Sequence, residues 1–476
     1  MRAYETVIGL EVHVELSTKT KIFCGCPTRF GAEPNTQICP VCTGMPGALP
    51  VLNREVAKDA IAAGLALNCE ITRVSRFDRK NYFYPDNPQN YQISQLYAPI
   101  CRNGYLTVET ESGPKRIGIH EIHMEEDAGK CIHDPSSGCT LVDYNRSGVP
   151  LLEIVSEPDM RSGEEAVAYL EKLRERLRYL GISDCRMQEG SMRADVNLSV
   201  RPAGSETLGT RTEMKNLNSF RSVLRAAANE SARQIEILER GEAVVQESRR
   251  WDDERGESYS MRSKEDAQDY RYFPEPDLLP LRVDDAWIEA VRVRQPEFRE
   301  EKTERFLREY EIPAYDVGIL TSAKRLADLF EEASAICGKP KKVSNWLMTE
   351  TMRLCREKGV DPEDLAFSAE HLAALVELAD AGEINSTVAK QVFLRVFEED
   401  ADPVRIVEEE GLRTVSDRGE LSTAVELMIR ENPKPVQDYL NGKKKAIGFL
   451  VGQVMRAMQG RADPEAVREE IARRLG

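Results

Sequence analysis

The sequence has 476 residues, which is too long for one ordinary hydrophobic core, so two to four domains are expected. With 41% hydrophobic and 31% charged residues, it has the composition of a folded protein, and no stretch resembles the roughly 18 apolar residues of a membrane span. The formal net charge of -16 argues against indiscriminate binding to polyanions. The first residues contain no apolar signal region, which predicts a cytoplasmic location.

The first part of the chain, to about residue 290, combines strand and helix patterns. Apolar residues alternate with polar ones over 7–16 and 196–200, as in half-buried strands. Helical spacing is clear at 164–180 and from 220 to about 240, each bounded by a capping residue or a glycine. Strand runs mixed with few helices predict an α+β fold rather than a doubly wound sheet.

From about residue 294 onward the pattern is almost wholly helical. Short helices are predicted at 323–335, 343–358, 369–378 and 387–397. We expect an α+β domain over 1–293, a helical domain over 294–405 and a small helical tail over 406–476.

Charge is unevenly distributed along the chain. Residues 411–476 contain twelve Lys or Arg against nine Asp or Glu, whereas residues 1–410 carry a net charge of -19. A basic tail suits contact with nucleic acid, although random surface bias explains the charge equally well. Lys443, Lys444 and Lys445 are the candidate contacts with nucleic acid.

Four cysteines form two close pairs, Cys24-Gly25-Cys26 and Cys39-Pro40-Val41-Cys42. Two such pairs can bring four thiolates around one ion, which is the arrangement that tetrahedral zinc requires. Four protein ligands leave no open position, so the zinc would be structural. The alternative is four reduced cysteines packed as small hydrophobic residues.

Acidic residues recur on strand-like segments. Glu11, His13 and Glu15 share one face of the first strand, and Glu125, Glu126 and Asp127 are consecutive. Asp195 and Glu213 lie on two further extended segments. Adjacent carboxylates repel one another unless a cation or an arginine is near, and hard oxygen ligands suit Mg²⁺. A solvated outer face would produce the same pattern on any single strand.

The segment 77–95 interleaves aromatic residues with cationic and amide side chains. This mixture suits a nucleotide site, with Arg79, Lys80 and Tyr82 as candidate contacts, although a well-packed β-loop is about as plausible. The chain contains no phosphate-binding loop of the G-x-x-x-x-G-K-[ST] type and no dinucleotide fingerprint. His120-Glu121-Ile122-His123 is one residue too short for the H-E-x-x-H zinc protease motif.

Many long motifs, in order along the whole chain, resemble the B subunits of bacterial tRNA-dependent amidotransferases. The segments that carry the resemblance are 9–16, the cysteine pairs, 77–95, 123–130, 143–150, 192–197, 211–220, 270–277, 438–443 and 448–455. The chain lacks the large domain that the archaeal relatives insert before the helical part, so it is similar to the bacterial or organellar form.

The resemblance implies a cradle-shaped catalytic domain with an antiparallel sheet similar to glutamine synthetase. It implies an ATP-dependent carbon–nitrogen ligase that phosphorylates the side-chain carboxylate of Glu-tRNA(Gln) or Asp-tRNA(Asn) and then amidates it. Ammonia would come from a glutaminase A subunit, and a small C subunit would complete a heterotrimer. Cys24, Cys26, Cys39 and Cys42 would bind zinc.

The resemblance also implies that Mg²⁺ is bound by Glu11, His13, Glu126, Asp195 and Glu213, with Glu125 close by. These residues and Lys80 are the predicted catalytic set, and ATP is the predicted nucleotide. Two alternatives from other classes remain: a zinc-containing tRNA-binding subunit without chemistry, and a stand-alone ATP-dependent carboxylate–amine ligase for a small metabolite. The sequence leaves open which aminoacyl-tRNA is the physiological substrate.

Overall fold

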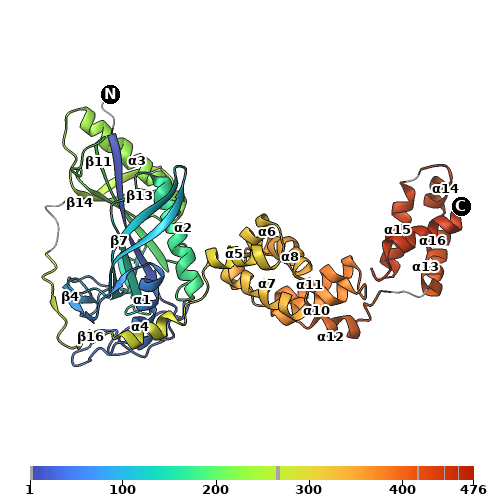
Figure 1. Cartoon of the computed structure of the whole chain (residues 1–476), viewed down its shortest axis with the longest axis horizontal. Helices are drawn as coiled ribbons and strands as arrows, with labels where there is room; N and C mark the ends of the chain where they lie inside the picture. Colours follow the sequence, from blue (N-terminus) through green and yellow to red (C-terminus); the bar gives the residue numbers. More distant parts are fainter. Residues whose placement is uncertain (1–3, 264–268, 415–417, 444, 459) are drawn as a thin grey trace. The chain divides into compact units, whose positions relative to one another are not determined.

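The computed structural model describes residues 4–263, 269–414, 418–443, 445–458 and 460–476. The chain divides into two compact units, Met1–Phe298 and Arg299–Gly476 (Figure 1). The first unit is built around a large sheet and the second is helical, which confirms the predicted α+β class. In the described residues, no helix is both long and apolar enough to cross a membrane.

A nine-stranded sheet forms the first unit. All neighbouring strands are antiparallel except β12 (Thr212–Lys215) and β13 (Glu247–Asp252), which are parallel. The strand order across the sheet is β14 (Glu257–Ser263), β13 (Glu247–Asp252), β12 (Thr212–Lys215), β11 (Met192–Pro202), β1 (Tyr4–Glu15), β10 (Pro150–Ser156), β7 (Gly113–Glu126), β6 (Cys101–Thr110) and β2 (Glu70–Ile71).

Residues along β1 alternate between the two faces of this sheet. Leu10, Val12 and Val14 are buried on one face, whereas Glu11 and His13 lie on the other. The register places Glu11 opposite Asp195 of β11 and His13 opposite Glu153 of β10. The central strands therefore bring their polar residues onto a shared face.

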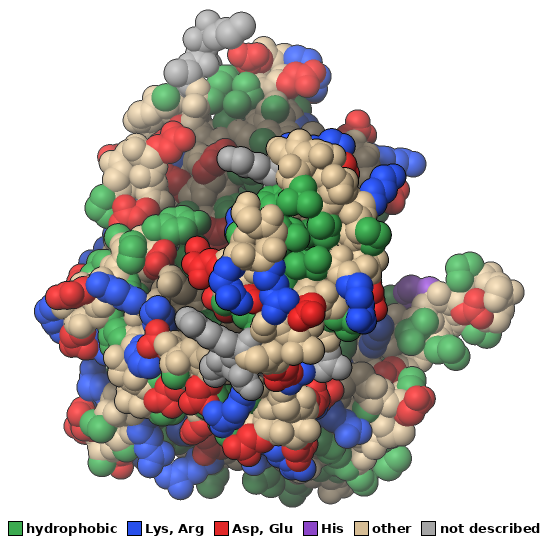
Figure 2. Space-filling model, turned by 90° about the vertical axis from the view of Figure 1, so that its right-hand side faces the viewer, with side chains coloured by type: hydrophobic (Ala, Val, Ile, Leu, Met, Phe, Trp, Pro, Cys, Tyr) green, Lys and Arg blue, Asp and Glu red, His purple; other side chains and the backbone are tan. Residues whose placement is uncertain are grey.

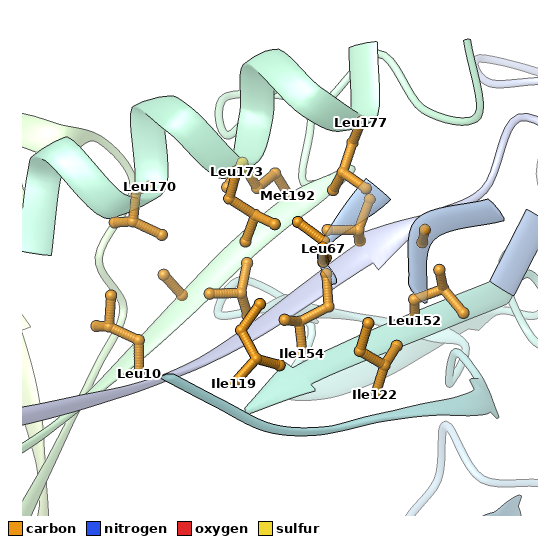
Figure 3. Packing of buried hydrophobic residues seen from close by; sticks show 14 of the residues in the cluster. Leu10, Leu67, Ile119, Ile122, Leu152, Ile154, Leu170, Leu173, Leu177 and Met192 are labelled. Carbon is orange, nitrogen blue, oxygen red and sulfur yellow. The ribbon is translucent and has the colours of Figure 1, made fainter. Parts of the chain in front are cut away.

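Three helices accompany the sheet: α1 (Arg54–Ala66), α2 (Gly163–Leu180) and α3 (Phe220–Glu239). Leu170, Leu173 and Leu177 point from α2 toward apolar residues of the central strands (Figure 3). The helices predicted near 164–180 and 220–240 are confirmed. Ser219 caps α3, and α2 is followed by Gly181, whose φ of 70° suits glycine.

Small strands and one short helix complete the first unit. The segment 77–95, for which a β-loop was one of the two expectations, contains the strands β4 (Asp78–Asn81) and β5 (Tyr91–Ser94), which pair with each other. The remaining elements are β3 (Val74–Ser75) with β16 (Leu281–Arg282), β4 (Asp78–Asn81) with β5 (Tyr91–Ser94) and β15 (Phe273–Pro274), the hairpin of β8 (Lys130–Asp134) and β9 (Cys139–Asp143), and α4 (Asp285–Arg292).

The second unit contains two separate groups of buried apolar residues, one within 306–407 and one within 425–471. The boundary near residue 405, between the expected helical domain and the expected tail, remains a prediction. The elements of the second unit are α5 (Arg299–Glu309), α6 (Ala314–Leu320), α7 (Lys324–Cys337), α8 (Pro340–Trp346), a π-helical turn (Leu347–Thr351), α9 (Met352–Lys358), a 3-10 turn (Pro362–Asp364), α10 (Ala369–Asp380), α11 (Ser386–Glu399), α12 (Pro403–Glu409), α13 (Arg418–Glu431), α14 (Pro433–Leu440), α15 (Ala446–Ala457) and α16 (Pro464–Leu475).

Candidate active site

Three carboxylates converge on the polar face of the sheet. Glu11 of β1, Asp195 of β11 and Glu213 of β12 each offer an oxygen, and these oxygens lie within 4.8 Å of one another. Lys215 is also there, with Nζ 2.6 Å from Asp195 Oδ2 and 2.8 Å from Glu213 Oε1. We call Glu11, Asp195 and Glu213 the carboxylate triad.

Neutral side chains fix two members of the carboxylate triad. Asn197 Nδ2 donates to Glu11 Oε1 at 2.8 Å, and Ser248 Oγ donates to Glu213 Oε2 at 2.6 Å. Burial, followed by the charge of Glu153, raises the pKa of Glu11. Burial opposes ionisation of Glu213, but Lys215 and Ser248 hold its pKa below the usual value.

A second group lies beside the triad and combines imidazole with carboxylates. The ligand atoms of His13, Glu125 and Glu153 lie within 4.8 Å of one another. His13 Nε2 is 3.5 Å from Glu125 Oε1 and 3.2 Å from Glu153 Oε2, and His123 Nε2 is 3.0 Å from Glu153 Oε2. We call His13, Glu125 and Glu153 the histidine group.

The histidine group holds opposite charges in close contact. Burial disfavours a charged imidazole, but Glu153 and Glu125 outweigh it and raise the pKa of His13 to about 8. Burial likewise opposes ionisation of Glu153, yet His123 and His13 hold its pKa well below the usual value. Both imidazoles therefore stabilise the Glu153 carboxylate.

Glu126 joins neither group, because it alternates with Glu125 along β7 and so lies on the other face of the strand. Its Oε1 accepts hydrogen bonds from Gln89 Nε2 at 2.6 Å and from the Ile93 backbone at 2.9 Å. Burial raises its pKa to about 8. It lines a cavity of about 200 Å³ together with Lys21, Cys42, Met45, Gln89 and Tyr91.

The third consecutive carboxylate, Asp127, is compensated by arginines. Arg193 donates to its Oδ2, and Arg146 Nε lies 3.4 Å away. Burial opposes ionisation of Asp127, but these two guanidinium groups keep its pKa low. Burial and the neighbouring Asp127 raise the pKa of Glu15 to about 8.

The three predicted nucleotide contacts have different surroundings. Lys80 Nζ lies 5.0 Å from the centre of the Tyr270 ring, and although burial opposes its charge, Glu125 and then Tyr272 raise its pKa. Arg79 is bound to Glu275 at 2.6 and 3.0 Å and stacks on a tyrosine, so its guanidinium connects β4 to the segment after β15. The Tyr82 ring packs edge-on against Tyr270.

Both groups on the polar face fit a divalent cation. Their donors are carboxylate oxygens with one imidazole, which suits Mg²⁺. Asn197 Oδ1, beside Glu11, is buried and has no hydrogen-bond partner among the described residues, so a cation or its water would satisfy it. Sequence reasoning missed Glu153, His123 and Lys215, whose positions depend on cross-strand register.

The four paired cysteines lie together, as expected for a zinc site. Their sulfur atoms are within 4.8 Å of one another, and Cys42 Sγ is 4.0 Å from Cys26 Sγ and 3.9 Å from Cys39 Sγ. Tetrahedral Zn–S bonds of about 2.3 Å place sulfur atoms about 3.8 Å apart, so the cluster fits zinc. Lys21 is fully buried beside it, with Nζ 3.4 Å from Cys42 Sγ.

The lysines predicted to bind tRNA lie between α14 and α15. Lys443 is 70% exposed and contacts Asp438 at 3.0 Å, and Lys445 is exposed. Lys444 lies outside the described residues. On the face of the molecule in Figure 2, Lys and Arg side chains are interspersed with Asp and Glu side chains.

Comparisons with known proteins cover nearly the whole chain. The family described as "GatB/GatE catalytic domain" matches residues 6–289, and the "GatB domain" matches residues 328–475. A protein of Agathobacter rectalis is 63% identical over 467 residues, 98% of each chain, and one of Lachnoclostridium phytofermentans is 61% identical over 475 residues, 100% of this chain and 99% of its own. A Caldicellulosiruptor bescii protein is 57% identical over 99% of each chain. All three are named as the B subunit of an aspartyl/glutamyl-tRNA(Asn/Gln) amidotransferase.

Proposed function

The chain belongs to the family of B subunits of aspartyl/glutamyl-tRNA(Asn/Gln) amidotransferases, which act in tRNA-dependent transamidation, and we propose that its sheet domain performs the ATP-dependent step. In this proposal the side-chain carboxylate of Glu-tRNA(Gln), Asp-tRNA(Asn) or both is first phosphorylated and then converted to the amide. The reaction takes place in the cytoplasm, in a heterotrimer with a glutaminase A subunit and a small C subunit.

The observation that carries the proposal is the convergence of charged side chains from five strands on one face of the sheet. The carboxylate triad comes from β1, β11 and β12, and the histidine group comes from β1, β7 and β10. Phosphoryl transfer needs alignment and charge neutralisation more than covalent help from the protein. A face rich in carboxylates can provide both through bound cations.

Both groups are proposed to bind Mg²⁺. The residues that would hold it are Glu11, Asp195 and Glu213 in one group and His13, Glu125 and Glu153 in the other, so Glu125 and Glu153 take the place expected for Glu126. When bound, Mg²⁺ would neutralise the phosphate charge during transfer. Lys80, which is half-buried and whose charged form is favoured by Glu125, adds positive charge on the same side.

The first chemical step replaces a poor leaving group on the substrate. A carboxylate oxygen of the aminoacyl group attacks the γ-phosphorus of ATP, the bond from that phosphorus to the β–γ bridging oxygen breaks, and ADP leaves. In the second step ammonia attacks the acyl carbon, the carbon–oxygen bond to phosphate breaks, and the nitrogen loses a proton. The glutaminase partner supplies the ammonia, so this chain needs no nucleophilic Ser or Cys.

The test uses Asp195→Asn and Glu153→Gln in the assembled enzyme. Each variant removes one ligand charge with little change in shape, so tRNA-dependent ATP cleavage should fall by roughly 100-fold or more while glutaminase activity is retained. The control is Asp285→Asn, whose side chain is exposed and forms an ion pair with Arg73, outside both groups. Full ATP-dependent amidation by both site variants would contradict the proposal.

A further inference from the structure

Lys215 places its ammonium against two members of the carboxylate triad. Its Nζ lies 2.6 Å from Asp195 Oδ2 and 2.8 Å from Glu213 Oε1, which are hydrogen-bonding distances to two of the three carboxylates. Its side chain is 31% exposed, so the stem has room to move toward solvent. The ammonium therefore neutralises part of the negative charge of the triad.

An ammonium and a divalent cation compete for the same oxygens. Mg²⁺ needs ligand oxygens at about 2.1 Å in a nearly octahedral arrangement, whereas the Lys215 ammonium already lies 2.6 and 2.8 Å from two oxygens of the triad and takes up space beside them. Two positive charges in contact with the same carboxylates also repel each other. Binding of the cation at this place should therefore displace the ammonium.

The triad can keep its arrangement when Lys215 moves away. Asn197 holds Glu11 and Ser248 holds Glu213 through hydrogen bonds of 2.8 and 2.6 Å, and both partners are neutral. Each of these carboxylates uses one oxygen for its neutral partner. The displacement of Lys215 therefore frees ligand atoms without leaving these two side chains unsupported.

We propose that Lys215 is an exchangeable counter-ion of the carboxylate triad. Its ammonium holds Asp195 and Glu213 before the divalent cation binds, gives way when the cation enters, and then donates hydrogen bonds to the phosphate oxygens of the nucleotide. This inference rests on the proposed function, because it assumes that a cation binds at the triad. It assigns Lys215 two successive partners, carboxylate and then phosphate.

The first arm of the test measures Mn²⁺ binding by electron paramagnetic resonance, in the assembled enzyme without nucleotide. Lys215→Met removes the competing charge, so Mn²⁺ should bind about tenfold more tightly, whereas Lys215→Arg, which keeps the charge, should not gain affinity. The matched control is Lys115→Met: Lys115 is 29% exposed and pairs with Glu165 at 2.7 Å, outside the triad. Unchanged or weaker Mn²⁺ binding by folded Lys215→Met would overturn the exchange.

The second arm measures ATP affinity at saturating Mn²⁺. Lys215→Met should weaken ATP binding by about tenfold and Lys115→Met should not change it, because only the former removes a phosphate partner. Equal ATP affinity in both variants and the parent enzyme would refute the contact with phosphate. Lys215→Gln serves as a second neutral variant if Lys215→Met does not fold.

A ligand variant separates this inference from the proposed function. Glu213→Gln removes one carboxylate of the triad and should weaken Mn²⁺ binding in the otherwise unchanged enzyme. If Glu213→Gln binds Mn²⁺ as tightly as the parent enzyme, the cation assignment at the triad fails, and the inference fails with it. If Glu213→Gln weakens binding but Lys215→Met does not strengthen it, only the inference fails.

Discussion

At the scale of single residues, a buried lysine beside the four paired cysteines balances charge. Lys21 is fully buried, with Nζ 3.4 Å from Cys42 Sγ and 3.2 Å from the Tyr144 carbonyl oxygen. Hydrogen bonding from Cys24 and from the Cys39 backbone, together with the charge of Lys21, lowers the pKa of Cys42 to about 4. Four thiolates around Zn²⁺ carry a net charge of about −2, and a buried cation reduces the cost of holding that charge in the protein.

Lys21→Met should therefore weaken zinc binding. Groups that contact the ligands of a metal typically change its affinity by about 10–100-fold, so zinc should pass to a chromophoric chelator at least about tenfold faster. The control is Lys19→Met, since Lys19 lies two residues away and is exposed. Equal release from both variants and the parent protein would show that Lys21 has no role in retaining zinc.

Residue patterns in the sequence could locate part of the polar face. Glu11 and His13 were recognisable because they alternate with buried apolar residues on one strand, and the structure brings both to the site. Glu153 was not recognisable, since its segment Pro150–Ser156 is mostly apolar and its place depends on pairing with β1 and β7. Three adjacent carboxylates did not reveal which of Glu125 and Glu126 faces His13, because that depends on the phase of the strand.

At the scale of elements, helix α1 packs closely against the edge of the sheet through a glycine. A Cβ added at Gly64 would lie 2.4 Å from Cys101 Sγ on β6 and 2.8 Å from Ile71 Cδ1 on β2. Glycine in a helix costs roughly 0.5–1 kcal/mol relative to alanine, so its presence here is explained by the close approach. The helix–strand distance depends on this missing side chain.

Gly64→Ala should destabilise the first unit even though alanine favours helices. Overpacking a buried contact costs about 1–3 kcal/mol, which exceeds the gain in helix propensity, so the melting temperature should fall by a few degrees. Adding Cys101→Ala removes the nearest atom and should recover part of the loss. The comparison is Gly318→Ala in α6, where nothing lies within 4 Å of the added Cβ and no loss is expected. A rise in stability with Gly64→Ala would contradict the packing argument.

Helix α1 also carries a carboxyl group with an unusual pH response. Burial raises the pKa of Asp59 to about 6, and Lys58 opposes the shift only partly. A carboxyl group whose pKa is higher in the folded state binds its proton more tightly there. The free energy of unfolding therefore increases as the pH falls from about 6 toward the pKa of the same group in the unfolded chain. Above pH 6 the ionised, partly buried group is a cost of about 1–2 kcal/mol after allowance for solvent screening.

Asp59→Asn should therefore raise the melting temperature of the first unit at pH 8 by a few degrees, and the difference should disappear near pH 4. The measurement is a pair of thermal melts across this pH range, with Glu171→Gln on helix α2 as the control because Glu171 is exposed. If the melting-temperature difference between Asp59→Asn and the parent protein grew toward low pH, the effect would have the wrong sign and burial of the Asp59 carboxylate would be excluded as its cause.

The elements themselves were predictable where capping residues bound a periodic pattern. The helices α2 and α3 have Ser162 or Ser219 before them, whose side chains accept from the first turn, and the predicted limits agree with the structure to within about two residues. The strands β4 and β5 were not predictable, because each has four residues and pairs across a loop containing two prolines. Residues 343–358 were expected as one helix, whereas a π-helical turn divides them.

At the scale of the whole molecule, charge is divided between an acidic body and a basic end. Residues 411–476 are net positive, although Lys443 already contacts Asp438 at 3.0 Å. Several other cations of this region are paired, including Arg474 with Glu426 at 3.1 Å. Any tRNA contact must therefore compete with these internal ion pairs.

Replacing Lys443, Lys444 and Lys445 together by alanine should weaken tRNA binding by roughly tenfold at low salt. Because each phosphate contact releases counter-ions, the slope of affinity against salt should also become less steep. The control is the triple replacement of Lys339, Lys341 and Lys342 by alanine, which removes the same amount of positive charge outside the tail. Lys339 and Lys342 form ion pairs with Asp380. Unchanged affinity and slope in the first variant would show that the three lysines are ordinary surface residues.

The alternation along β1 and β11 has a consequence for how this chain can change in length. Neighbouring positions face opposite sides of the sheet, so Leu10 and Val12 support the hydrophobic interior while Glu11 and His13 lie among the proposed reacting groups. A single residue inserted or deleted in the middle of such a strand would turn every following side chain to the opposite face of the sheet. Carboxylates would then enter the interior, and aliphatic side chains would take the places of the metal ligands. Changes in length should therefore be tolerated only in the connecting loops, whereas these strands can vary by substitution alone.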